Sequence, residues 1–94
     1  MFDIFKSTIS VPDDVLMREM AGESVLLNLG SESYFGLDVV GTQMWAALTK
    51  SSSVDAAFNL LLTEYAVEPL RLRADLAAFI EKLRQLGLLH VETN

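Results

Sequence analysis

Few side chains in this sequence could perform chemistry. Its one histidine, His90, could act as a general acid or base or bind a metal ion, but it lies near the end of the chain. Zinc and calcium sites need several spaced ligands, and here a lone imidazole has only scattered carboxylates around it. The absence of cysteine excludes disulfides, thiolate metal sites and cysteine nucleophiles. We therefore interpret His90 as a surface residue and expect no bound metal ion.

Paired acids and glycines also lack the spacing that catalysis or cofactor binding needs. Asp13 and Asp14 are adjacent, and neighbours in an extended segment point to opposite sides, so the two cannot share a proton. The spacing of Gly30, Gly36 and Gly41 does not match a phosphate-binding loop. A serine at a helix start could carry a phosphopantetheine arm, but the Asp-Ser-Leu attachment sequence is absent. We expect no catalytic residue, no cofactor and no enzyme activity.

Length and composition predict a single domain that spans residues 1–94. The chain is too short to divide into two units that each bury a core, and its 51% of hydrophobic and 21% of charged residues exclude the disordered class. No apolar run approaches the roughly 20 residues of a membrane-spanning helix, so we expect no membrane partner. Asp3 and Lys6 make the first ten residues unlike a signal peptide. Together with the absence of cysteine, this predicts a cytoplasmic protein.

The charge balance argues against nucleic acid as a partner. A net charge of -6 repels phosphates unless the basic residues gather on one face. Four of the seven basic residues do fall within residues 70–86, opposed there only by Asp75 and Glu81; the four are Arg71, Arg73, Lys82 and Arg84. Two interpretations stay open: an anionic partner at this segment, or a solvated face whose charges compensate one another at i,i+3 and i,i+4 spacing.

The first half of the sequence predicts an antiparallel meander of three strands. Residues 15–20 and 24–29 are β-prone runs separated by a turn at 21–23. The second run alternates with period two, with Val25, Leu27 and Leu29 on one side and Leu26 and Asn28 on the other. The turn formers of residues 30–33 precede a short aromatic strand, residues 34–37.

After Leu37 the apolar period changes from 2 to 3.6, which predicts helices. The first runs from about 39 to 49 with Asp38 as N-cap, and its inward stripe is Leu37, Val40, Gly41, Met44, Trp45 and Leu48. Ser52 and Asp55 resemble a capping box that opens a second helix. Its stripe is Val54, Ala57, Phe58, Leu61, Leu62 and Tyr65, and Pro69 prevents it from continuing.

A third helix, from about 70 to 86, stops at Gly87, a typical residue just beyond a helix end. Its inward side chains are Leu72, Leu76, Phe79, Ile80 and Leu83. Residues 88–91 could form a last strand. The expected fold class is therefore α+β, with a three-stranded antiparallel sheet followed by three helices (βββααα).

The third strand suggests a binding site, because it has one neighbour and leaves its other edge unpaired. Such an edge accepts an extended peptide through main-chain hydrogen bonds, and the helix of residues 70–86 is the natural wall of a groove beside it. Alternation assigns Phe35 and Leu37 to the core, which leaves Tyr34 and the backbone of Ser33 to Gly36 for recognition. Gly36 would let another backbone come close.

These segments, taken in order, resemble the PqqD-like family of peptide chaperones, over about residues 13–91. The motifs that carry the resemblance are Val25-Leu26-Leu27-Asn28-Leu29, Tyr34-Phe35-Gly36-Leu37-Asp38, Gly41 with Trp45, the stretch 54–65, Val67-Glu68-Pro69, Phe79-Ile80 and Leu86-Gly87-Leu88. The family often has asparagine where this chain has Asp38, and both residues cap helices. The Tyr-Phe-Gly-Leu strand looks more like members that serve lasso peptides or other radical-enzyme pathways than like the member from pyrroloquinoline quinone biosynthesis.

The resemblance implies a winged helix-turn-helix-like fold and a function without chemistry of its own. A member of this family is a recognition element for ribosomally synthesised, post-translationally modified peptides: it binds the precursor's leader peptide as an added strand and presents it to a modifying enzyme, such as a radical SAM enzyme or a leader peptidase. The implied peptide-binding residues here are Ser33, Tyr34, Phe35, Gly36, Leu37, Leu76, Phe79, Lys82 and Leu83, with Arg73 and Arg84 at the rim. Among those of the third helix, Phe79, Lys82 and Leu83 are favoured.

Two other functions remain as alternatives. A winged-helix regulator would place the third helix in the major groove of DNA, although the total charge opposes this. A structural subunit would cover its apolar sheet edge with a second copy of itself and form a homodimer.

Overall fold

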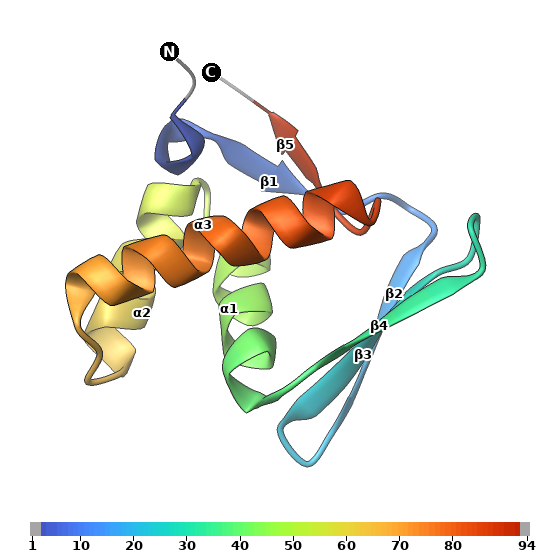
Figure 1. Cartoon of the computed structure of the whole chain (residues 1–94), viewed down its shortest axis with the longest axis horizontal. Helices are drawn as coiled ribbons and strands as arrows, with labels where there is room; N and C mark the ends of the chain where they lie inside the picture. The colour runs from blue at the N-terminus through green and yellow to red at the C-terminus, as the bar shows by residue number, and fades with distance from the viewer. Residues whose placement is uncertain (1–2, 93–94) are drawn as a thin grey trace.

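The computed structural model describes residues 3–92, in which three strands pair as one sheet and three helices pack on one side of it (Figure 1). The sheet contains β2 (Val15–Met20), β3 (Glu23–Asn28) and β4 (Ser33–Leu37), antiparallel in that order. The helices are α1 (Val39–Lys50), α2 (Val54–Glu64) and α3 (Pro69–Gln85). The predicted α+β order, three strands followed by three helices, is confirmed.

The turn between β2 and β3 sets the register of the sheet. It contains only Ala21 and Gly22, whose φ angles of 56° and 85° are the positive values that a tight type I′ hairpin requires. The predicted turn was one residue longer, because Glu23 already belongs to β3 and pairs with Met20. From there the pairing runs without a bulge to Val15 and Asn28.

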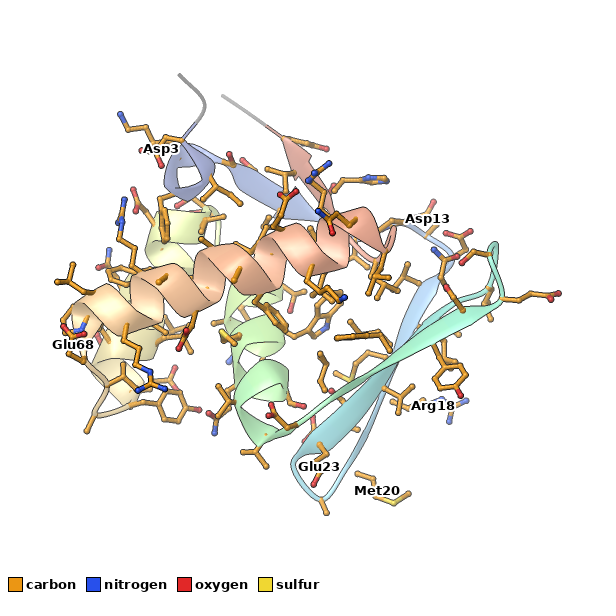
Figure 2. All side chains as sticks on the ribbon, viewed as in Figure 1. Asp3, Asp13, Arg18, Met20, Glu23 and Glu68 are labelled. Carbon is orange, nitrogen blue, oxygen red and sulfur yellow. The ribbon has the colours of Figure 1, made fainter. Side chains whose placement is uncertain are left out.

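The sheet has an inner face toward the helices and an outer face that the described residues leave uncovered. Leu26 is fully buried on the inner face, and beside it the Ser24 hydroxyl lies 2.8 Å from the Thr42 hydroxyl of α1 in a buried hydrogen bond. The predicted alternation of β3 is therefore present, but its more apolar side, with Val25, points outward. Figure 2 shows Arg18, on the same face as Val25, directed away from the helices.

Local capping fixes where α1 and α2 begin. The Asp38 carboxylate accepts a hydrogen bond from the Gly41 N–H at 2.8 Å, as expected for an N-cap. The predicted capping box at Ser52 is wrong by one residue. Ser53 is the N-cap of α2, because its extended backbone brings the hydroxyl within 3.1 Å of the Ala56 N–H.

The ends of α3 are equally well defined. Pro69 is its first residue, where a missing N–H costs nothing, and the Glu68 carboxylate accepts from the next two N–H groups. At the other end Gly87 has a φ of 73°, and Leu88 donates to the Leu83 carbonyl at 2.9 Å, which together form a Schellman motif. The predicted stop at Gly87 is confirmed.

The core lies between the inner face of the sheet and the three helices. Its fully buried large side chains come from β3, all three helices and the segment after α3: Leu26, Leu48, Val54, Leu76, Ile80, Leu83, Leu88 and Leu89. Val40, expected to point inward, is 58% exposed, since the N-terminal turn of α1 extends beyond the core.

A small antiparallel ribbon joins the two ends of the described chain. β1 (Thr8–Ser10), which follows a short 3-10 helix, η1 (Ile4–Lys6), pairs with β5 (His90–Glu92). The last strand is confirmed, although it begins two residues and ends one residue later than predicted, whereas β1 was missed. His90 is exposed on β5, as expected for a surface residue.

Candidate functional site

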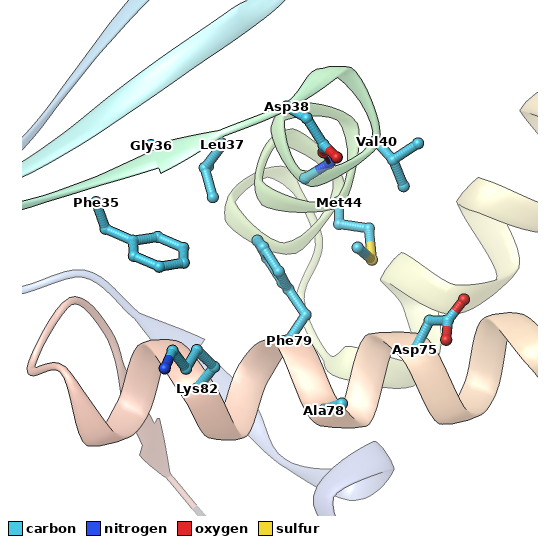
Figure 3. Close-up of a pocket in the computed structure, with 11 residues that line it drawn as sticks. Phe35, Gly36, Leu37, Asp38, Val40, Met44, Asp75, Ala78, Phe79 and Lys82 are labelled. Carbon is cyan, nitrogen blue, oxygen red and sulfur yellow. Dashed lines mark hydrogen bonds between the residues drawn. The ribbon is translucent and has the colours of Figure 1, made fainter.

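A groove with a volume of about 520 Å³ lies between β4 and α3. Three segments line it: Phe35, Gly36 and Leu37 of β4; Asp38, Val40, Gly41 and Met44 at the start of α1; and Asp75, Ala78, Phe79 and Lys82 of α3. In Figure 3 the Phe35 and Phe79 rings point into the space between the two elements, with Lys82 toward the Phe35 end and Asp75 toward the Val40 end. Most of this lining is apolar, as in a site that binds side chains by burial.

The hairpin register determines which main-chain groups of β4 face the open edge. A two-residue turn closes on a hydrogen-bonded pair, and such pairs then alternate along an antiparallel ladder. The Leu29 N–H donates to the Asp14 carbonyl at 2.8 Å, which fits this alternation. When this alternation of hydrogen-bonded pairs is continued from β2 across β3 to β4, the N–H and C=O groups of Tyr34 and Gly36 point away from β3. These two residues present the unpaired main-chain groups of β4.

Glycine lets the start of α1 approach β4 closely at the floor of the groove. A Cβ at Gly41 would lie 3.3 Å from Asp38 Oδ1 and 3.4 Å from Leu37 Cβ, tighter than most contacts of that kind. Gly36 is different, because a Cβ there would meet no atom within 4 Å. Its side of β4 is open, so packing within the chain does not require glycine at this position.

The side chains of β4 divide between the two faces of the sheet. Phe35 pairs with Leu26 and Leu37 with Ser24, so both point inward, Phe35 partly buried at the groove and Leu37 in the core. Tyr34 pairs with Leu27, and its side chain, 76% exposed, stands on the outer face away from the groove. Only the main chain of Tyr34 therefore faces the site.

Two of the four predicted α3 contacts line the groove and two do not. Phe79 and Lys82 are part of the lining, whereas Leu76 and Leu83 are fully buried and unavailable to a peptide. The stripe through Leu76 and Leu83 packs on the core. The groove stripe is offset from it by one residue, about 100° around the helix. Apolar periodicity did not separate Phe79, on the groove stripe, from Leu76 and Leu83, because all three side chains are apolar.

The whole groove lies within the part of the chain that matches a known family. Residues 23–89, from the start of β3 to the end of the core, match the family described as Coenzyme PQQ synthesis protein D (PqqD). The chain belongs to the PqqD family. No curated protein matches this PqqD-family chain.

Two solved structures share the fold of this PqqD-family chain. The first, TbiB1 in complex with the TbiA(beta) leader peptide, is 31% identical, with a TM-score of 0.78 over 85% of this chain and 93% of that one. The second, lasso peptide synthetase B1 complexed with the leader peptide, has a TM-score of 0.76 over 87% of this chain and 96% of that one. At 22% identity, the second likeness concerns the fold alone.

The rim arginines predicted for the PqqD-family chain lie elsewhere. The Arg73 guanidinium stands over the Phe5 ring, 3.9 Å from its centroid, and Phe5 packs edge-on against Phe58 of α2. Arg84 pairs with Glu81, with its Nε 3.0 Å from a Glu81 oxygen. That pair lowers the pKa of Glu81 and raises the pKa of Arg84, chiefly through the hydrogen bond between them. Neither arginine lines the groove.

The basic residues of α3 are mostly compensated within the PqqD-family chain. Arg71 lies 3.7 Å from Asp75 in an i,i+4 pair, and Arg84 with Glu81 forms an i,i+3 pair, as the solvated-face interpretation predicts. Lys82, by contrast, forms no ion pair within residues 3–92 and lines the groove. No contiguous basic face remains on α3 for DNA, so the arrangement disfavours the DNA-binding alternative.

Metal-binding side chains do not cluster within residues 3–92 of this PqqD-family chain. Among the described residues, no three histidine or acidic side chains lie close enough to hold a metal ion, and none of the helices is long and apolar enough to cross a membrane. Sequence reasoning missed the contributions of Val40, Gly41 and Met44 to the groove, because their helical spacing assigned them to the core. The one available signal was the pair of valines at positions 39 and 40, too apolar for an exposed first helical turn.

Proposed function

We propose that this chain binds the leader peptide of a ribosomally synthesised, post-translationally modified precursor as a strand added to β4, and presents the precursor to a modifying enzyme. The observation that carries the proposal is an unpaired β4 edge beside an apolar groove walled by α3. The likeness to TbiB1, solved with the TbiA(beta) leader peptide, supports a leader peptide as the occupant. This added strand is the guest peptide.

Main-chain and side-chain contacts would have different roles in this binding. Tyr34 and Gly36 offer main-chain hydrogen bonds, each with a net value of about 1 kcal/mol, which do not depend on the sequence of the guest peptide. Selectivity would come from guest side chains on the inner face, which would pack between Phe35 and Phe79. Lys82 would favour an acidic guest residue at its end of the groove.

The precursor would be passed on rather than modified by this chain. Its partner would be a peptide-modifying enzyme, such as a radical SAM enzyme or the leader peptidase of a lasso peptide pathway. The absence of cysteine supports work in the cytoplasm, where precursors are made. The function would need no metal or cofactor, because holding and positioning a peptide requires none.

Hydrogen exchange followed by NMR tests the proposal at single residues. The probes are synthetic leader peptides of the precursors encoded beside the gene for this chain. Bound peptide should protect the amides of Tyr34 and Gly36, which are open in the free protein, while the amides of Phe35 and Leu37 are protected with or without peptide. If every such leader leaves the Tyr34 and Gly36 amides unchanged, the proposal is wrong.

Self-association through the same edge would protect the same two amides. It would do so without peptide and in proportion to protein concentration, which distinguishes a homodimer from leader binding. A concentration series in the absence of peptide, with the mass measured by sedimentation, is therefore the control for the exchange experiment.

A further inference from the structure

A second apolar hollow, of about 140 Å³, lies beyond the groove where α1, the end of α2 and the loop before α3 meet. Its lining consists of Val40, Gln43, Met44, Leu61, Tyr65, Val67 and Leu72. Three of these apolar side chains remain accessible, with exposed fractions of 58% for Val40, 43% for Val67 and 36% for Tyr65. Gln43 is the single side chain among them with a hydrogen-bonding amide, so the hollow suits an apolar group.

The hollow continues the groove. Val40 and Met44 line both, and a depression between them shares Asp38 and Asp75 with the groove and Val67 and Leu72 with the hollow. The lining residues that α3 contributes are spaced three or four apart from Leu72 to Lys82, so they lie on one side of the helix. One trough therefore follows α3 from the β4 edge to the loop between α2 and α3.

The distance along α3 between the hollow and the groove matches a short stretch of extended peptide. Leu72 and Phe79 are seven residues apart, which is roughly 10 Å along a helix. An extended chain covers that length in about three residues. A strand paired with β4 can therefore reach the hollow shortly after it passes Leu37.

We infer that the guest peptide has a second anchor: beyond the segment paired with β4, an apolar side chain binds in the hollow formed by Val40, Met44, Tyr65, Val67 and Leu72. This inference rests on the proposed function, because the same peptide fills the groove and the hollow. The paired segment places alternate side chains opposite Phe35 and Leu37. The second anchor lies about three residues from the side chain that packs on Phe79, on the side of Leu37.

Val67 and Val39 provide a matched pair of variants. Val67 lines the hollow and not the β4 groove, while Val39 stands on the other side of α1 and lines neither. Their exposed fractions, 43% and 46%, are nearly equal, so Val67→Ser and Val39→Ser remove the same atoms from similarly exposed positions. Both substitutions should leave the fold intact.

The probe is a display library of random 16-residue peptides, selected on the wild-type chain and on each variant. Wild type and Val39→Ser should enrich peptides with apolar residues at alternate positions and a further apolar residue about three positions from the one that packs on Phe79. Val67→Ser should lose only the further residue. The best synthetic peptide should bind Val67→Ser about fivefold more weakly than the other two proteins.

Two results would overturn the inference, and they differ. If Val67→Ser enriches the same peptides and binds them as tightly as wild type, while the Tyr34 and Gly36 amides are still protected, the hollow is unused and the proposed function stands. If no selected peptide protects those amides, both the proposed function and the second anchor are wrong.

Discussion

The sheet has two outer strands, β2 and β4, and only β4 borders the groove that α3 walls, whereas the hollow that Glu19 of β2 borders is also lined by Lys50 and Glu64. Both strands leave main-chain groups unpaired, those of Tyr34 and Gly36 on β4 and those of Met17 and Glu19 on β2. Five of the six residues of β2 are exposed, whereas α3 stands along β4. An unpaired edge supplies hydrogen bonds to any strand, so under the proposed function the apolar wall beside β4 would supply the selectivity.

The largest effect is expected from proline at the β4 edge. Tyr34→Pro removes an N–H that would bond the guest peptide and leaves the ladder to β3 intact, so affinity for a leader peptide should fall at least about tenfold. The matched control is Glu19→Pro, which removes an outward N–H from the β2 edge. Calorimetric titration of both proteins measures the difference. Equal losses in the two variants would contradict the distinction between the edges.

Removal of the wall should have the next largest effect. Phe79→Ala takes away the ring that faces Phe35 across the groove, and the lost burial should weaken peptide binding by about 1.5 kcal/mol, or roughly tenfold. Leu70→Ala, a change at a 76% exposed residue of the same helix, serves as control. Because Phe79 also touches the core, denaturant unfolding must accompany the titration. If a folded Phe79→Ala protein binds the peptide as tightly as wild type, the α3 wall of the groove does not contribute to binding.

Charge reversal in α3 should weaken peptide binding more at Lys82, which lines the groove, than at Arg84, which does not. Lys82→Glu reverses the one groove-lining cation without an ion pair in the described chain, so affinity for an acidic leader should fall about fivefold and the loss should shrink at high salt. Arg84→Glu, remote from the groove, should change affinity less than twofold, within the range of surface substitutions. Fluorescence titrations at low and high ionic strength compare the two. Equal losses of affinity in the two variants would mean that Arg84 also lies at the rim of the peptide-binding site.

The smallest effect is expected from the side chain of Tyr34. Tyr34→Ala keeps the edge N–H and C=O and removes only a ring on the outer face, so peptide affinity should stay within about twofold of wild type. The contrast with Tyr34→Pro isolates the main chain as the binding element at this position. A loss comparable to that of the proline variant would show that the outer face also contacts the peptide.

Local patterns in the sequence predicted most elements, because each of these depends on neighbours along the chain. Asp38 caps α1 and Gly87 ends α3 as the residue types indicate. The groove needed more than periodicity, since Leu76 and Phe79 are both apolar and only the positions of β4 and α1 decide which one faces a peptide. The pairing of β1 with β5 was missed for a related reason: Ile9 and Val91 are brought together by the whole fold, and nothing near either residue indicates the other.

That ribbon has a consequence for how the chain could be attached to other proteins. Thr8 pairs with Glu92, so the two described ends leave the domain side by side, on the opposite side of α3 from β4 (Figure 1). A linker at either end would start away from the groove and leave it unobstructed. The same adjacency would let the whole unit be inserted into a surface loop of a larger enzyme with little strain on the host. Such a tether would raise the local concentration of a bound precursor at the enzyme without altering a single contact in the groove.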